Sequence, residues 1–198
     1  MTYTLTIPYT EIPIPANGNL PARVSYSPMV KTNIEINNQT LNFNFFSIID
    51  SGADHGTVAK CRFSRFGKNS LDESPHPIAP IGDISQQSHH CVFPATYGER
   101  LGINIESGIH MPAHGVGGGD NWYFHAIKTW VEIEGQSWHW ECMAAFSKGT
   151  DNLGIGLLGR IGFFELFEEV TFEQKNRIVR LKVLGERPPQ NPPPPPSN

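Results

Sequence analysis

Apolar and polar residues alternate along most of the chain, which is the pattern expected of β-strands with one buried face. Residues 3–15 alternate in this way but carry three prolines, which cannot donate to a strand ladder, so this segment is predicted to be an edge strand or an extended arm. Further strands are predicted at residues 22–30, 32–39, 41–50, 126–133, 137–146, 169–173 and 177–184. Tight turns rich in Asn, Gly and polar residues are predicted between them at 36–40, 134–136 and 174–176.

Two short helices interrupt this pattern. One is predicted from Pro94 to Gly102, because proline favours the first turn of a helix and glycine its end. The other is predicted to carry Phe163, Phe164 and Phe167, after an apolar run that begins near residue 153. Residues 60–92 are polar and weakly periodic, and we interpret them as an insertion.

The chain is therefore predicted to have three parts: an extended N-terminal arm (1–22), one folded domain (23–184) and a proline-rich tail (185–198). The tail ends in "RPPQNPPPPPSN", a composition typical of an exposed polyproline-type segment.

Composition favours the same fold class. The 198 residues are 38% apolar, only 17% charged, and include 19 glycines and 17 prolines, which fits a turn-rich, all-β domain with a sizeable core. The net charge of −4 gives no basic surface for phosphates, so nucleic acid is not an expected partner.

Three cysteines at wide spacings predict free thiols in a reducing compartment rather than a disulfide framework; they are Cys61, Cys91 and Cys142. The first residues lack the basic and apolar segments of a secretory signal, and no apolar run is long enough to cross a membrane. We therefore expect a cytoplasmic protein without a membrane partner. His89, His90 and Cys91 do not follow a paired-ligand spacing, so no metal and no cofactor are expected.

Three short motifs follow one another along the chain: "IIDSGA" at 48–53, "GVGGG" at 115–119 and "GLLGR" at 156–160. Each alone is common. In this order, with the first at the end of an apolar strand, the chain resembles a retropepsin-type aspartic protease, the single-domain kind found in retroviruses and as standalone bacterial proteins. The resemblance covers residues 23–184 and implies a closed β-barrel with a glycine-rich flap hairpin and one or two short helices.

The resemblance also implies the roles of particular residues. The catalytic residue is Asp50, and the active-site loop that follows it is Ser51, Gly52, Ala53 and Asp54. The flap corresponds to Gly115, Val116, Gly117, Gly118 and Gly119. The residues that support the loop are Leu158, Gly159 and Arg160, and Arg160 is expected to form an ion pair with Asp54.

Peptide hydrolysis without a covalent intermediate needs one carboxylate to activate water and a second carboxyl to donate a proton. Two carboxylates about 3 Å apart cannot both ionise, so they share one proton. Asp50 is the only aspartate followed by Ser/Thr-Gly, so a single chain supplies half of such a pair. An active enzyme would be a homodimer in which two Asp50 residues meet and cleave a polypeptide, with the arm and the last hairpin as candidate dimer strands.

Two other functions remain open at this stage. The chain could be a catalytically inactive barrel of the same fold that binds peptides or proteins. A weaker alternative is a metal-dependent hydrolase that uses the His and Cys residues near position 90.

Overall fold

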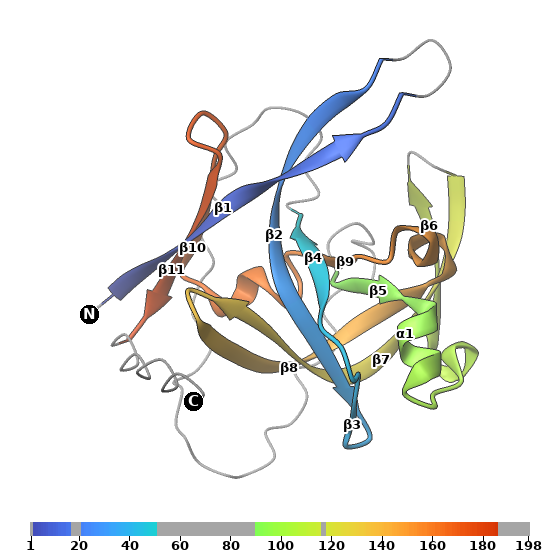
Figure 1. The fold of residues 1–198 in the computed structure, drawn as a ribbon. Coiled ribbons are helices and arrows are strands. Elements are labelled where there is room, and N and C mark those ends of the chain that lie inside the picture. The colour runs from blue at the N-terminus through green and yellow to red at the C-terminus, as the bar shows by residue number, and fades with distance from the viewer. Residues whose placement is uncertain (1, 17–20, 51–89, 116–117, 186–198) are drawn as a thin grey trace, which may run out of the picture.

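The computed structural model describes residues 2–16, 21–50, 90–115 and 118–185 (Figure 1). Within these residues eleven strands form one continuous sheet. The strands are β1 (Thr2–Ile14), β2 (Arg23–Ile36), β3 (Gln39–Thr40), β4 (Phe45–Ile49), β5 (Val92–Pro94), β6 (Ile109–Gly115), β7 (Gly118–Ile133), β8 (Gln136–Ser147), β9 (Gly156–Leu158), β10 (Glu169–Glu173) and β11 (Ile178–Leu184). The helices are short: α1 (Ala95–Arg100) and the 3₁₀ turns η2 (Ile105–Ser107), η3 (Lys148–Leu153) and η4 (Phe164–Leu166).

Six of these strands close into a barrel, in the order β2, β4, β9, β5, β8 and β7. The ring closes because β7 pairs with β2 in antiparallel register, from Lys31 opposite Glu132 to Glu35 opposite Lys128. Closure removes the free edges that an open sheet would expose. The prediction of an all-β fold with a closed barrel is thereby confirmed.

The barrel interior is filled by large apolar side chains that alternate along each strand with outward-facing residues. Phe93, Phe146, Ile34, Val131 and Leu158 are each at most 1% exposed. Burying a side chain of this size contributes about 1.5–3 kcal/mol relative to leaving it in water. The interior is therefore a packed core and not a channel.

A second layer of strands extends the sheet beyond the barrel. The first half of β1 pairs with β11, from Thr2 opposite Leu184 to Pro8 opposite Ile178, and its second half pairs with the beginning of β2. β10 lies on the other side of β11. Apolar residues of this layer, such as Leu5 and Leu181, belong to the same buried cluster as the barrel interior. In Figure 1, β1 crosses from this layer to β2 and so links the two parts.

The predicted tight turns are confirmed. Asn37, Asn38, Glu134 and Gly135 have positive φ angles of 53°, 61°, 50° and 74°, the conformation that the commonest two-residue hairpin turns require. The helix predicted between Pro94 and Gly102 is also present as α1, which starts directly after Pro94 and is followed by Gly102 with φ of 75°.

Two predicted elements differ from the structure. The strands predicted at 22–30 and 32–39 are one continuous strand, β2, because β1 supports its first half while β4 and β7 support its second half. The helix predicted to carry Phe163, Phe164 and Phe167 is only the three-residue turn η4. Gly162 at φ of 96° precedes it and β10 begins at Glu169, so tertiary packing leaves no room for a longer helix.

Some predicted segments fall largely outside the described residues. These are the proline-rich tail after Gly185 and most of the predicted insertion, although its last residue, Val92, lies in β5. None of the helices in the described part of the chain has the length and apolar character needed to cross a bilayer.

Candidate functional site

Asp50 stands where β4 leaves the barrel wall. Along β4, Phe45, Ser47 and Ile49 are buried, and Asp50 directly after them is exposed. Its backbone N–H donates a 3.0 Å hydrogen bond to the carbonyl oxygen of Leu158 at the end of β9. The carboxylate therefore lies at the rim of the barrel, with its backbone fixed by the neighbouring strand.

β4 and β9 run parallel, with Ser47 opposite Gly156 and Ile49 opposite Leu158. Parallel strands end at the same edge of a sheet, so Asp50 and Gly159, which directly follow these two strands, lie at the same rim of the barrel. The three residues predicted to support the loop sit here: Leu158 is fully buried, Gly159 is buried, and Arg160 is half-buried. The described part of "IIDSGA", up to Asp50, therefore lies beside "GLLGR", and the support of the loop by these three residues stays a prediction.

Gly156 allows this close pairing. A Cβ at this position would lie 2.5 Å from Ser47 Oγ and 2.8 Å from Cδ1 of Phe93, both shorter than real contacts. We expect Gly156→Ala to lower the free energy of unfolding by about 1–3 kcal/mol, because the buried Phe93 ring must move. Urea unfolding monitored by circular dichroism measures the change.

Ser47 provides the matched control. Its side chain is buried and, in the described part of the chain, Oγ has no hydrogen-bond partner, so Ser47→Ala is expected to leave stability nearly unchanged or higher. The double variant Ser47→Ala/Gly156→Ala should recover part of the stability that Gly156→Ala loses, because the Ser47 hydroxyl, one of the two clashing groups, is gone. Equal stability of Gly156→Ala and the wild type would contradict the packing argument.

The remaining predicted loop residues, Ser51, Gly52, Ala53 and Asp54, lie outside the described residues. The predicted ion pair between Arg160 and Asp54 therefore stays a prediction. Nε of Arg160 is buried and has no hydrogen-bond partner within the residues that the structure describes.

The predicted flap glycines lie at the end of the hairpin formed by β6 and β7. Gly115 is opposite Gly118, and His114 is opposite Gly119, while Val116 and Gly117 lie outside the described residues. The two strands meet in regular antiparallel register from Ile109 onward. A hairpin is thus present where the glycine motif predicted one, and its action as a flap remains a proposal.

A small apolar cluster joins the base of this hairpin to the strands beside Asp50. Its buried members are Val92, Met111, Phe124 and Ala145, and its partly buried members are Trp122, Met143 and Leu157. Leu157 precedes Leu158 and therefore points to the opposite side of β9, out of the barrel core. The three sequence motifs did not predict this cluster, although the opposite orientation of neighbours in "GLL" was the available signal.

Two cysteines lie close together beside Gly162, in the segment that follows Arg160. The Sγ atoms of Cys91 and Cys142 are both about 3.3–3.5 Å from the position that a Cβ of Gly162 would occupy. Hydrogen bonding to Cys91, and then burial, raise the pKa of the Cys142 thiol well above its usual range. Both cysteines are free thiols, as predicted, and Cys142 stays protonated and weakly nucleophilic near neutral pH.

His90, next to Cys91, is buried against an aromatic ring. The His90 ring lies 4.8 Å from the ring of Phe124 in an edge-on contact. Within the described residues, no three side chains of His, Cys, Asp or Glu gather as metal ligands. His89 and Cys61 lie outside that part of the chain.

The arrangement can present one fixed carboxylate at the rim of a closed barrel, beside an apolar cluster and a hairpin. That is half of a two-carboxylate site for water activation. No family model, curated protein or solved structure matches the chain, so a function has to be argued from this geometry.

Proposed function

We propose that the chain is an aspartic endopeptidase of the retropepsin type, active as a homodimer with one Asp50 from each copy. The observation that carries the proposal is the position of Asp50. It directly follows a buried strand, and its N–H is bonded to Leu158 on the parallel strand β9. A carboxylate held by its backbone in this way is pre-positioned, which is what acid–base catalysis requires.

In this proposal the second carboxylate comes from another copy of the chain. Among the described aspartates, Asp120 accepts hydrogen bonds from Ser147 and from its neighbour's N–H. Asp151 accepts from the backbone N–H and the hydroxyl of Thr96. Both carboxylates support local structure, and Asp50 is exposed at the rim, where a twofold axis could bring it to its equivalent.

In this mechanism a water molecule sits between the two Asp50 carboxyl groups, which share one proton. The ionised carboxylate takes a proton from the water as the oxygen attacks the peptide carbonyl carbon. The protonated partner donates its proton to the carbonyl oxygen, which gives a diol intermediate. When the C–N bond breaks, the carboxyl that took the water proton delivers it to the leaving nitrogen. A hydroxyl of the diol returns a proton to the other carboxylate, so the pair again shares one proton. The reaction needs only the two carboxylates and water.

The substrate would bind as an extended strand between the β6–β7 hairpin and the Asp50 loops, where backbone hydrogen bonds supply affinity. The apolar cluster of Met111, Trp122 and Leu157 flanks this position. It favours apolar side chains next to the cleaved bond, because burying them removes apolar surface from water.

The test is a cleavage assay on an unbiased peptide library from about pH 3 to 7, read by mass spectrometry. We expect new termini, strongest at acid pH, whose yield falls with a pepstatin-like inhibitor and rises more steeply than linearly with enzyme concentration. Peptide binding without cleavage, at concentrations where the chain is dimeric, would contradict the proposal and favour a binding module.

A further inference from the structure

One part of the sheet leaves the body of the molecule. The second half of β1 and the first half of β2 form a two-stranded ribbon, the hairpin arm, which we define as residues 9–16 and 21–28. Figure 1 shows the arm extending away from the barrel, past the end of β4. Its base is anchored, since the guanidinium of Arg177 lies 3.6 Å from the centre of the Tyr26 ring and Tyr9 N–H donates to the Arg177 carbonyl oxygen.

The outer part of the arm carries apolar residues on both faces. Residues directly opposite in an antiparallel pair share a face. Pro13 and Val24 are opposite each other on one face, and Ile12 and Ile14 lie on the other. Val24 is 53% exposed, one of the most exposed large apolar side chains in the described chain. The face of the isoleucines also carries Ser25 and Arg23, which lie opposite Ile12 and Ile14.

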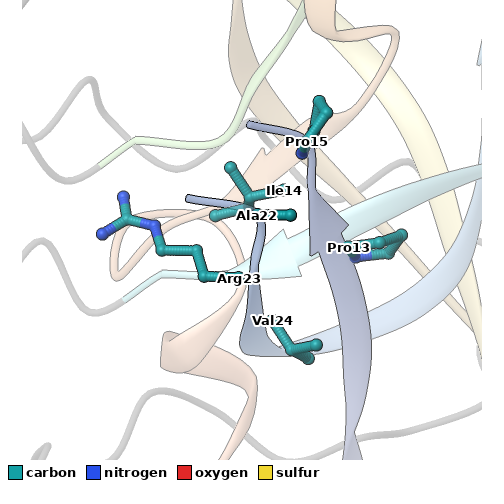
Figure 2. A pocket seen from close by; sticks show the side chains of 6 residues that line it. All are labelled: Pro13, Ile14, Pro15, Ala22, Arg23 and Val24. Carbon is teal, nitrogen blue, oxygen red and sulfur yellow. The ribbon is translucent and has the colours of Figure 1, made fainter. Parts of the chain in front are cut away.

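The end of the arm also forms an open hollow of about 440 Å³. It is lined by Pro13, Ile14, Pro15, Ala22, Arg23 and Val24. Figure 2 shows these side chains around the ends of the two strands, with the guanidinium of Arg23 directed away from the ribbon. Apart from Arg23 the lining is apolar. In the described chain no hydrogen bond, ion pair or ring contact joins these six residues to any other element.

The strand register relates the arm to Asp50. β2 and β4 are antiparallel with Met29 opposite Ile48, so continuing the register by two residues brings Ser27 level with Asp50. From Ser27 to Arg23 the arm continues for four residues, about 13 Å of strand. The arm therefore runs on beyond the carboxylate, into the space on the far side of it.

We propose that the hairpin arm clasps a second copy of the chain and holds the two Asp50 residues together. The inference rests on the proposed function, in which a second barrel must occupy the space beyond Asp50. A two-stranded ribbon is marginally stable alone, and it gains stability when a neighbouring molecule covers its exposed apolar residues. Within the described residues the second half of β1 pairs with β2 alone, so its other edge can meet a partner.

Twofold symmetry gives the dimer two arm contacts, because each copy contributes one arm and binds the arm of the other copy. A charge placed on the arm would be buried twice in each dimer without a partner. We therefore expect Val24→Asp to weaken dimerisation at least about a hundredfold, and Ile14→Asp to act in the same way on the other face. Leu153→Asp is the control, because Leu153 is also exposed, at 65%, but lies in η3, away from the arm.

Analytical ultracentrifugation over a wide concentration range measures the dissociation constant of each variant, and circular dichroism verifies the fold. We expect dimers for the wild type and Leu153→Asp, and folded monomers for the two arm variants. A wild type that stays monomeric, or arm variants that dimerise as the wild type does, would overturn the clasp. Cleavage is assayed on the same samples as a separate readout.

The two readouts separate the clasp from the protease. If the arm variants lose the dimer and the wild type does not cleave peptides, the clasp is supported and the proposed protease activity is excluded. If the wild type cleaves peptides as a dimer and the arm variants still form that dimer, the clasp is excluded and the proposed protease activity is supported. If both are correct, raising the concentration of Val24→Asp should restore dimers and cleavage together.

Discussion

Replacing Asp50 with asparagine is expected to abolish peptide cleavage, lowering the rate by about a thousandfold or more. The amide can neither take a proton from water nor donate one as a carboxylic acid does. In a homodimer the substitution removes both members of the pair at once. Because the Asp50 side chain is exposed and its backbone N–H still bonds Leu158, stability should be unchanged. The measurement is the initial rate on the best peptide from the library, beside a thermal melt.

Asp151→Asn is the matched control, because it makes the same chemical change at a carboxylate that supports α1 through Thr96. An amide oxygen can still accept those hydrogen bonds, so cleavage should continue at the wild-type rate. Asp50→Asn dimers that cleave as fast as the wild type would exclude Asp50 as a catalytic residue.

Mixed dimers test whether the two Asp50 residues act as one unit. If chains of wild type and Asp50→Asn are mixed equally and exchange freely, about a quarter of the dimers carry two aspartates. A shared pair therefore predicts that activity falls to about a quarter of the wild-type value. Activity near one half would mean that each chain works alone, and the proposed mechanism would be wrong.

The local features of the fold could be predicted from the sequence. Turns at Asn37–Asn38 and Glu134–Gly135 depend on residues that tolerate positive φ, so the chemistry of a few neighbours decides them. The helix α1 is bounded by Pro94 and Gly102 for similarly local reasons. The strand that ends at Asp50 was also predicted from its apolar residues, and β4 covers Phe45–Ile49.

Features that depend on distant partners could not be predicted from local pattern. The continuity of β2 through Pro28 and Lys31 arises because three other strands support it in turn. The parallel pairing of β4 and β9 joins residues more than a hundred positions apart, and only the resemblance to a known family suggested it. The cluster around Leu157 and the hairpin arm likewise depend on which side of a strand the tertiary fold leaves uncovered.

Phe163→Ala is expected to lower the free energy of unfolding by about 3–5 kcal/mol, a larger loss than that expected for Gly156→Ala. Phe163 is fully buried, and its ring lies 5.1–5.9 Å from those of Trp140, Phe164 and Phe167. It belongs to the buried cluster that contains residues of the barrel interior and, from the outer layer, Val170 and Leu181. Truncation leaves a cavity between these parts, and chemical denaturation measures the loss.

Phe46→Ala makes the same change at a ring that is 49% exposed on β4, so it removes a similar volume without leaving an enclosed cavity. Its cost should stay within about 0.5 kcal/mol. If the two variants were equally stable, the side chains around η4 would be loosely packed and would not hold the loop after β9 in place. A large loss confined to Phe163→Ala would instead mean that tightly packed neighbours enclose this ring and hold the segment between β9 and β10 against the core.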